Sequence, residues 1–338
     1  MKKVQIGIIG AGRIGRVHAQ SIAFGIPEAA VAAISDPLIE FAEKAAQEFG
    51  IPHAYADYRK ILDDPAIDAI LICSPTPTHA DIAMEAARAG KHIFCEKPVD
   101  LKIKKILQTK KVVEEEGVKM QVGFNRRFDH NFRRIRQLAN DGELGEIQMV
   151  RITSRDPEPP SPEYAKSSGG MFMDMTIHDF DMARFQSGSD VVEVYAAGAV
   201  TVDPEIGKAG DIDTAVITLK FANGALGVID NCRKAVYGYD QRVEVFGTSG
   251  AASAENDTET NVVLSTKEAV CKDKPLYFFL ERYMASFQTE IREFVQAILN
   301  DQPVPVSIDD GLKPILIAMA ANKSMKENRP VKIAEIME

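Results

Sequence analysis

This chain of 338 residues lacks long hydrophobic runs, paired cysteines and an excess of positive charge. No stretch reaches the roughly 20 apolar residues that a membrane span needs. The apolar run after Lys2 and Lys3 stops within seven residues at a glycine turn, so we do not expect a signal peptide. These absences predict a soluble, cytoplasmic protein with no membrane partner.

Cysteine spacing and net charge exclude further classes of protein. The four cysteines contain no CxxC pair, which argues against structural zinc and a disulfide framework and favours reduced thiols. The formal net charge of -9 gives no general attraction to phosphate backbones, so nucleic acid is not an expected partner. The length exceeds the size at which one hydrophobic core stops growing, which predicts two domains.

The N-terminal third alternates apolar strands with amphipathic helices, a pattern typical of a parallel sheet wrapped by crossover helices. Strands are predicted at Val4–Ile9, Ala30–Ser35, His53–Tyr55, Ala69–Cys73, His92–Cys95 and Met120–Gly123. Helices are predicted near Arg13–Phe24, Leu38–Phe49, Thr78–Ala89 and Ile103–Glu116. We therefore expect a doubly wound α/β domain with a parallel sheet over residues 1–124.

Residues 125–338 show another pattern, in which longer strands follow one another directly. Strands are predicted at Ile147–Thr153, Val191–Val202, Asp213–Phe221, Ala225–Cys232, Gln241–Gly247 and Ala251–Glu255. Helices are predicted at Phe132–Asn140, Met173–Ser187, Tyr283–Leu299 and Gly311–Glu327. This order predicts an α+β domain with an open, mostly antiparallel sheet. Because such a sheet must hide its uncovered face, we expect copies of the chain to associate through it.

A glycine-rich turn, Gly10-Ala11-Gly12-Arg13-Ile14-Gly15, follows the first predicted strand. Gly10 would make the tight turn, Gly12 would let the backbone approach a pyrophosphate at the helix N-terminus, and Gly15 would let the helix pack on the strand. Such turns also occur as purely structural elements. Here the second strand delivers an acid at the expected distance of about 20 residues, which favours a Rossmann dinucleotide site.

That acid, Asp36, indicates which dinucleotide binds. Its carboxylate accepts hydrogen bonds from both ribose hydroxyls of NAD and repels the 2′-phosphate of NADP. Arg13, a residue of the glycine turn, would soften the repulsion of that phosphate. We therefore predict NAD as the cofactor, with the turn residues Gly10, Gly12, Arg13, Ile14 and Gly15 and the acid Asp36 as its binding residues.

The segment Glu96-Lys97-Pro98 is the first place suited to chemistry on a bound NAD. It stands at the carboxyl end of a parallel strand, where open α/β sheets bind their ligands. A lysine at such an edge is often only solvated surface. The strand position, the preceding acid and the proline that restricts the lysine backbone favour a functional role for Lys97.

The second place is a helical segment in the other domain, where Asp174, His178 and Asp181 are spaced to share one side of a helix. The plainer interpretation is a helix acid with a satisfied core histidine. Metal binding is a further alternative, but the six histidines show no HExxH or HxH spacing, so no metal is expected. A nucleotide domain that needs a proton carrier favours catalysis by Asp174 and His178.

Taken together, these motifs resemble the Gfo/Idh/MocA family of NAD(P)-dependent sugar and polyol dehydrogenases over essentially the full chain. The resemblance rests on the glycine turn, on Glu96-Lys97-Pro98, on Gly123-Phe124-Asn125-Arg126-Arg127-Phe128, and on the Asp174 and His178 pair. The segments Phe94–Pro98, Arg126–Asp129, Asn231-Cys232 and Tyr237–Asp240 are similar to the inositol dehydrogenases of that family.

The resemblance implies a set of site residues. It assigns catalysis to Lys97, Asp174 and His178, and substrate contacts to these three with Arg127, Asp156 and Tyr239. It adds Asn125 and Asp181 as further candidate substrate contacts. At the carboxyl ends of the neighbouring strands, Ser74, Pro75, Thr76, His79, Glu96 and Lys97 are expected to line the nicotinamide side of the cofactor, although Pro75 is also ordinary turn chemistry.

One departure from the family pattern concerns specificity. Many inositol 2-dehydrogenases carry threonine directly after the catalytic aspartate, where this chain has Met175, and the nearest hydroxyl is on Thr176. The expected reaction is oxidation of a cyclic polyol, with myo-inositol before scyllo-inositol. The alternatives are another sugar dehydrogenase, an NAD-dependent glycosidase of the family, and a regulatory protein that senses NAD. The resemblance also implies a homotetramer.

A mechanism follows from the residue types. Histidine, whose ordinary pKa is about 6.5, is the side chain best suited to accept a hydroxyl proton near neutral pH. Asp174 would orient the imidazole of His178, and Lys97 would donate to the reacting oxygen as hydride leaves for the nicotinamide. Which of the three residues is the formal base stays open at this point.

Overall fold

The structure is a computed structural model, and it describes residues 3–337, with only the backbone at Ser167. The chain forms two compact units. Unit 1 comprises the chain up to Phe128 and the segment Met284–Lys313, and unit 2 comprises Asp129–Tyr283 and Pro314–Glu338. The sequence-based domains, 1–124 and 125–338, place the first boundary close to this one. They differ in that residues 284–313 belong to unit 1.

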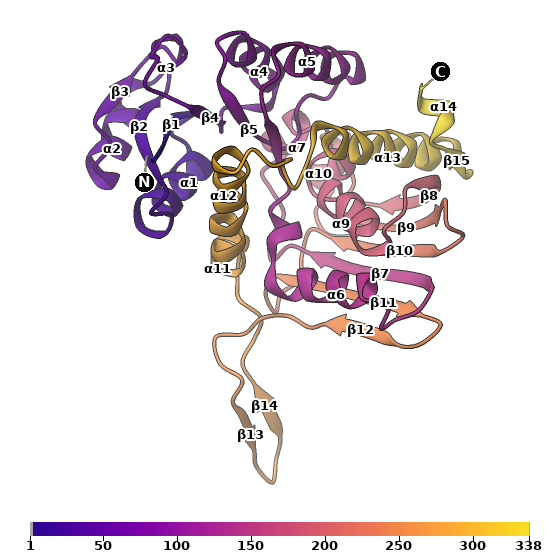
Figure 1. The fold of residues 1–338 in the computed structure, drawn as a ribbon. Coiled ribbons are helices and arrows are strands. Elements are labelled where there is room, and N and C mark those ends of the chain that lie inside the picture. Colours follow the sequence, from indigo (N-terminus) through magenta and orange to yellow (C-terminus); the bar gives the residue numbers. More distant parts are fainter. Residues whose placement is uncertain (1–2, 338) are drawn as a thin grey trace. The chain divides into compact units, whose positions relative to one another are not determined.

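Unit 1 is built on a six-stranded parallel sheet of order β3-β2-β1-β4-β5-β6 (Figure 1). Its strands are β1 (Val4–Ile9), β2 (Ala29–Ser35), β3 (His53–Tyr55), β4 (Ala69–Ile72), β5 (His92–Glu96) and β6 (Met120–Gly123). Apart from the edge strand β3, these strands are largely buried and almost continuously apolar, as strands of a covered parallel sheet are. The order reverses between β1 and β4, so ligands of such sheets bind at the carboxyl ends there.

Helices cover both faces of this sheet. They are α1 (Arg13–Gly25), α2 (Ile39–Phe49), α3 (Arg59–Leu62), α4 (His79–Arg88), α5 (Ile103–Glu116) and α12 (Met284–Leu299), with 3₁₀ turns η1 (Thr76–Thr78) and η2 (Asn125–Phe128). Ile291, Phe294 and Val295 of α12 lie in the same hydrophobic core as β1 and α1. This shared core explains why a helix from the C-terminal part of the chain belongs to unit 1.

Unit 2 contains a seven-stranded sheet of order β12-β11-β7-β10-β9-β8-β15. Its strands are β7 (Ile147–Arg155), β8 (Val191–Ala199), β9 (Thr214–Phe221), β10 (Leu226–Cys232), β11 (Asp240–Gly247), β12 (Ala251–Ala254) and β15 (Val331–Lys332). The β7 and β10 pair is parallel and the other pairs are antiparallel. The predicted mostly antiparallel sheet is confirmed, with one parallel pair at its centre.

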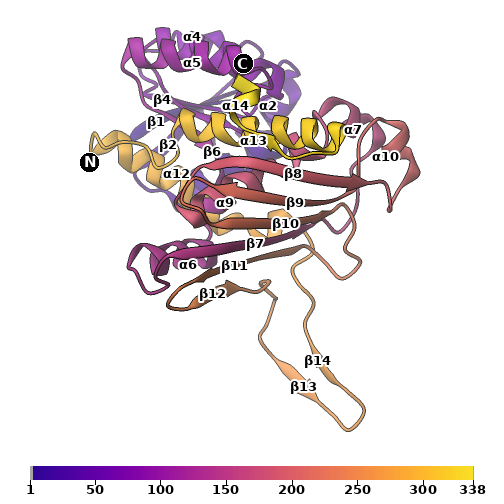
Figure 2. The ribbon, with the colours of Figure 1, turned by 90° about the vertical axis from the view of Figure 1, so that its right-hand side faces the viewer.

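The remaining elements of unit 2 lie around this sheet. Its helices are α6 (His130–Asn140), α7 (Pro162–Ser167), α8 (Met171–Asp174), α9 (Ile177–Ser187), α10 (Pro204–Lys208), α11 (Phe279–Arg282) and α14 (Ala334–Met337), and α13 (Ile308–Glu327) runs across the boundary between the units. The strands β13 (Val263–Ser265) and β14 (Val270–Lys272) form a hairpin that projects away from the sheet of unit 2 (Figures 1 and 2).

One face of the unit 2 sheet is covered by α6 and α9, while Figure 2 looks onto the opposite face. The strands alternate buried and exposed residues accordingly, with β9 as the most regular example. The outward side chains include large apolar ones: Tyr195, Val216, Leu226 and Phe246 are all exposed. A sheet face with this composition is typical of a surface that meets another protein.

The helix predicted over Met173–Ser187 is interrupted. Helix α8 ends at Asp174 and α9 begins at Ile177, because the N–H of Thr176 donates to the carbonyl of Met171, one residue wider than an α-turn. The buried Thr176 hydroxyl binds the Asn231 amide oxygen of β10 at 2.6 Å. This contact holds the chain at the break, so Asp174 and His178 belong to two short helices rather than to one face of one helix.

None of the helices within residues 3–337 combines the length and the apolar character that a bilayer crossing requires.

Candidate active site

The glycine turn between β1 and α1 has the geometry that its sequence predicts. Gly10 has a φ of +103°, and a Cβ there would lie 2.6 Å from the backbone of Cys73. A Cβ on Gly15 would lie 1.9 Å from the carbonyl oxygen of Gly10. A Cβ on Gly12 would meet nothing within 4 Å. Gly10 and Gly15 are thus required by packing, while Gly12 faces open space where a phosphate would approach.

Asp36 lies beside this turn at the end of β2. One carboxylate oxygen accepts from the N–H of Ala11 at 3.0 Å, and the other accepts from the N–H of Leu38 at 3.0 Å. Each oxygen retains a further lone pair for a hydroxyl donor. The two backbone bonds fix the carboxylate next to the turn, the arrangement that recognises the ribose of NAD. Arg13 and Ile14 begin α1 directly after the turn.

His79 joins the two loops that follow β4 and β5. Its Nε2 lies 2.6 Å from the carbonyl oxygen of Ser74, and its Nδ1 lies 2.8 Å from the carbonyl oxygen of Pro98. The ring is 2 % exposed. His79 therefore braces the loop that carries Ser74, Pro75 and Thr76 against the one that carries Lys97, a supporting position that its sequence context did not reveal.

The end of β5 carries the other predicted unit 1 residues. Lys97 is half-buried and is followed by a cis peptide to Pro98. The Glu96 carboxylate faces inward and lies 2.7 Å from Nε2 of the fully buried His18. The predicted cofactor residue Glu96 thus has a partner within the unit, and Lys97 stands at the carboxyl edge of the sheet.

Arg127, a predicted substrate contact, lies in η2 of unit 1. Its Nη2 donates to Oδ1 of Asp310 at 3.0 Å, and Oδ2 of Asp310 accepts from both the hydroxyl and the N–H of Ser307. Asp310 is therefore a fixed partner that orients the guanidinium. The neighbouring Asn125 is buried in the same turn.

Unit 2 brings together two acids that are 18 positions apart in the chain, and a buried arginine joins them. Both Nη atoms of Arg233 lie 3.2 Å from Oδ2 of Asp174, and Nη1 lies 3.5 Å from Oδ2 of Asp156. The Tyr164 hydroxyl donates to Oδ1 of Asp174 at 3.0 Å. The side chain of Arg233 is 4 % exposed. Both oxygens of Asp174 are thus held by donors, which fixes the orientation of the carboxylate.

His178 is the second residue of α9 and is half-buried. The adjacent Asp179 is fully buried and accepts from Nδ2 of Asn231 at 2.9 Å. Asn231 thereby binds both Thr176 and Asp179, which lie two positions before and one position after His178. Asp181, the further candidate substrate contact, is 1 % exposed.

Tyr239 lies deeper than a typical ligand contact. It is 6 % exposed, and its ring packs edge-on against Tyr283 with centroids 5.9 Å apart. Its neighbour Asp240 is also buried. Although burial alone would raise it, the pKa of Asp240 is held below its usual range by hydrogen bonds from Arg242, Tyr237 and Asn256.

Sequence reasoning missed Arg233, Tyr164 and Asp310. Each one acts by holding a predicted residue: Arg233 and Tyr164 hold Asp174, and Asp310 holds Arg127. Arg233 was detectable in principle, because it directly follows Asn231-Cys232, a segment that already stood out. The other two have no local signature, since their partners come from separate elements.

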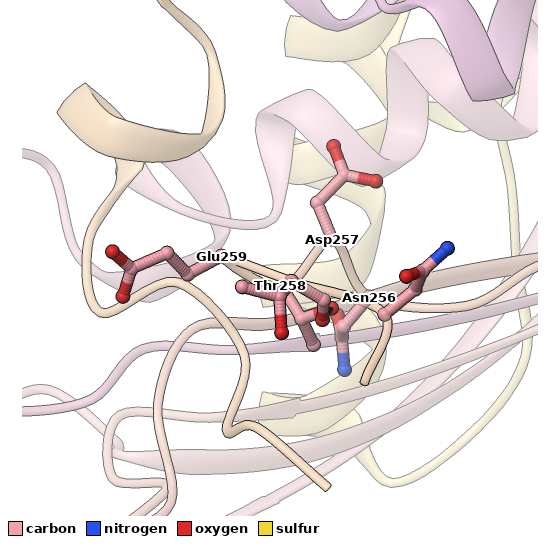
Figure 3. Close-up of a pocket in the computed structure, with 6 residues that line it drawn as sticks. Asn256, Asp257, Thr258 and Glu259 are labelled. Atoms are coloured by element: carbon pink, nitrogen blue, oxygen red, sulfur yellow. Dashed lines mark hydrogen bonds between the residues drawn. The ribbon is translucent and has the colours of Figure 1, made fainter. Parts of the chain in front are cut away.

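A hollow of about 470 Å³ lies elsewhere in unit 2, along the loop Asn256–Asn261 (Figure 3). Asp257 and Glu259 point in different directions there. Asp257 pairs with Arg282 at 2.9 Å, and Asn256 donates to Asp240 at 2.6 Å. The nearby group of Asp129, His130 and Asp257 offers ligand atoms for a metal, but the cation of Arg282 already occupies its centre. This loop therefore lacks convergent groups that would bind a ligand.

The fold and the glycine turn define the class of protein: an oxidoreductase with an NAD-binding Rossmann domain and a mixed-sheet second domain. Comparison with known families agrees. The description "Oxidoreductase family, NAD-binding Rossmann fold" matches residues 4–124, and "GFO/IDH/MocA C-terminal domain" matches residues 132–253. The chain belongs to the GFO/IDH/MocA oxidoreductase family, and its cofactor is NAD.

Similar proteins cover nearly the whole chain. An uncharacterized oxidoreductase, YrbE, from Bacillus subtilis is 53 % identical over 98 % of this chain and 97 % of its own length. A myo-inositol 2-dehydrogenase from Thermotoga maritima is 46 % identical over 99 % of this chain and all (100 %) of its own. The structure of scyllo-inositol dehydrogenase from Lactobacillus casei with bound NAD(H) and scyllo-inositol has 32 % identity and a TM-score of 0.92, and covers 98 % of this chain and 100 % of that chain.

Proposed function

We propose that this protein oxidises myo-inositol at one ring hydroxyl to the corresponding keto-inositol, with NAD as hydride acceptor. The observation that carries the proposal is the set of fixed acids in unit 2, in which Arg233 and Tyr164 hold Asp174. Helix α9, which bears His178, begins three positions after Asp174. A polyol presents many hydroxyl donors, and carboxylates held in place are suitable acceptors for them. Relatives named inositol dehydrogenases support this substrate class.

The residues divide the chemical work as follows. The glycine turn and Asp36 bind and orient the cofactor, which accepts the hydride at its nicotinamide. His178 is assigned the role of accepting the hydroxyl proton, because an imidazole is the side chain best suited to do so near neutral pH. Asp174 stabilises the imidazolium that forms. Lys97 donates to the reacting oxygen and stabilises its alkoxide character.

The remaining predicted residues bind the other hydroxyls. Arg127 donates from a guanidinium fixed by Asp310, and Asp156 accepts from a position fixed by Arg233. Losing one such partner leaves a polar group of the substrate unsatisfied, which costs on the order of 1–3 kcal/mol. Tyr239 is assigned to the floor of the site, since it is nearly buried.

Turnover of purified protein with NAD tests the proposal directly. We expect NADH absorbance to rise with myo-inositol and more weakly with scyllo-inositol. Lys97→Ala should lower kcat by about 10²- to 10⁴-fold, as loss of a group that acts in the transition state does. No NADH with any inositol or aldose would refute the proposal. An NAD-dependent glycosidase, which oxidises its sugar only transiently, would cleave a glycoside without net formation of NADH. An NAD sensor would bind NAD without turnover.

We also propose that copies of the chain associate through the exposed face of the unit 2 sheet, as a homotetramer. The exposed side chains of Val216 on β9 and Phe246 on β11 lie on that face. Sedimentation should show a mass well above the monomer's. The double variant Val216→Glu with Phe246→Glu should dissociate the assembly, and Leu264→Glu on the separate hairpin serves as the control. A monomeric wild type would contradict this assignment.

A further inference from the structure

A second group of ionisable side chains lies in unit 1 and has no part in the chemistry assigned above. His18 from α1, Glu96 from β5 and Glu290 from α12 present side-chain atoms that all lie within 4.8 Å of one another. His18 and Glu290 are 0 % exposed. Three elements that are distant in the sequence thus meet at one buried polar cluster inside an apolar core.

The contacts within this cluster are unequal. Nε2 of His18 lies 2.7 Å from Oε1 of Glu96, a distance at which the imidazole donates and the carboxylate accepts. Both carboxyl oxygens of Glu290, by contrast, lack a hydrogen-bond partner among residues 3–337. The side-chain amide of Gln121 donates to the backbone carbonyl of Glu290 at 2.9 Å.

Within residues 3–337, aromatic rings and thiols are found beside this cluster. His18 packs edge-on against Phe94 and Phe287, with ring centroids 5.1 Å and 5.8 Å away. Burial, and then the charge of Glu96, raise the pKa values of the thiols of Cys73 and Cys95. Two carboxylates and two thiols therefore compete for one imidazole, so only one negative charge is stable here.

We propose that Glu290 is a neutral, proton-bearing acid and that, with His18, it positions the Glu96 carboxylate beneath the strand end that carries Lys97. Burial and the neighbouring Glu96 charge raise the pKa of Glu290 well above its usual range, in agreement with this assignment. Glu96 is the residue directly before Lys97. Its side chain also lies against Gly123 of β6, because a Cβ on Gly123 would be 3.1 Å from Oε2 of Glu96. Any shift of Glu96 therefore moves the backbone at Lys97.

A metal ion would be the other way to neutralise the same atoms. The 2.7 Å separation of His18 and Glu96 is a hydrogen-bond distance, and two ligands about 2.0–2.2 Å from one zinc ion would be separated further. A proton fits this geometry without movement. Stoichiometric zinc in the purified holoenzyme that disappears in Glu290→Gln would overturn the proposal.

Infrared difference spectroscopy tests the protonation without any substrate. The spectrum of the wild type minus that of Glu290→Gln, recorded at neutral pH, should contain the carbonyl stretch of a protonated carboxylic acid. Glu43, an exposed acid on α2 of the same unit, provides the control: Glu43→Gln should remove only ionised carboxylate bands. A Glu290→Gln difference spectrum with carboxylate bands alone would show that Glu290 is ionised and would end the proposal.

The positioning role rests on the proposed dehydrogenase activity and needs a second experiment. His18→Leu removes the donor to Glu96 and should lower kcat about tenfold or more while KM stays within about twofold. His18→Gln returns an amide donor and should restore kcat to within about threefold of wild type. Full activity in His18→Leu, or no rescue by His18→Gln, would refute positioning. A wild type that turns over no inositol would refute the proposed function, while the infrared result still decides the state of Glu290.

Discussion

The two units neutralise their buried acids by different means. In unit 2, two carboxylates are paired with buried arginines: Asp129 with Arg282, and Asp174 with Arg233. In unit 1, Glu290 meets another acid and, within the described residues, no hydrogen-bond donor. A guanidinium remains charged at any accessible pH, whereas a proton is exchanged with solvent. The two units should therefore respond differently to substitution and to pH.

The difference follows from what each unit has to hold in place. Under the proposed function, unit 2 holds carboxylates in place as acceptors for a polyol, and arginine does so through directional hydrogen bonds. Unit 1 encloses its cluster between helices that pack on a parallel sheet. A bound proton neutralises a carboxylate there without adding volume.

The largest effect is expected at the Arg282 and Asp129 pair, whose side chains are 3 % and 2 % exposed. Although burial alone would lower it, the pKa of Arg282 is raised by Asp129. Arg282→Met leaves the Asp129 carboxylate buried without its cation and should cost about 3–5 kcal/mol of unfolding free energy. Denaturant titration of the variant and the wild type measures this loss.

A double variant shows whether charge is the cause. Asp129 also accepts from the N–H groups of Asn131 and Phe132 at the start of α6. Asp129→Asn keeps an acceptor for that cap but removes the charge, so Arg282→Met with Asp129→Asn should recover most of the lost stability. If the double variant is as unstable as Arg282→Met alone, packing rather than neutralisation is responsible and the comparison between the units fails.

The next largest effect concerns Arg233 and is measured in catalysis. Arg233→Met releases Asp174 and Asp156 and should cost at least about 2 kcal/mol, or roughly 30-fold in kcat/KM for myo-inositol. Arg233→Lys keeps the charge but has no planar fork to reach both acids, so it should recover only part of the activity. Arg134→Met, at an exposed arginine of α6, is the matched control. Equal activity of Arg233→Met and the control would contradict the assigned role.

The proton proposed on Glu290 of unit 1 should affect how the free energy of unfolding depends on pH. The folded state raises the pKa of Glu290, so above pH about 4.3 the unfolded chain releases a proton that the folded chain retains. Stability relative to Glu290→Gln therefore falls as pH rises, by about 1.4 kcal/mol per pH unit, until the pKa of the folded state is reached. Denaturant titrations at about pH 6 and about pH 7 measure the slope, and parallel curves for the two proteins would argue against a bound proton.

Local patterns predicted most of the framework. The strands of unit 1 were predictable because each is a short apolar run between turn signals, and the Gly10 to Gly15 turn because its steric demands act within a few residues. Contacts between distant segments were not predictable. Arg233 reaches Asp156 because β10 lies parallel to β7, so the residues that follow the two strands are neighbours. Thr176, at the break between α8 and α9, binds Asn231 of β10.

The assignment of α12 shows the same limit. Its amphipathic pattern predicts a helix over Tyr283–Leu299, and the structure has Met284–Leu299. Which unit it joins depends on Ile291, Phe294 and Val295 fitting the core formed by β1 and α1, and no pattern within the helix identifies that core. The buried Glu290 reads in sequence as one more polar position of the helix, so its cluster with His18 and Glu96 emerges only from the packing.

The smallest effect is expected at an exposed ion pair of unit 1, where water, rather than a bound proton, stabilises the carboxylate. Lys110 donates to both oxygens of Asp309 at 2.7 Å, yet the two side chains are 29 % and 50 % exposed. Such a pair gains little over solvation of the separate ions, so Lys110→Ala should change the unfolding free energy by less than about 1 kcal/mol, and less still in high salt. A loss as large as that of Arg282→Met would mean that unit 1 also depends on ion pairs, and the contrast between the units would then lie only in exposure.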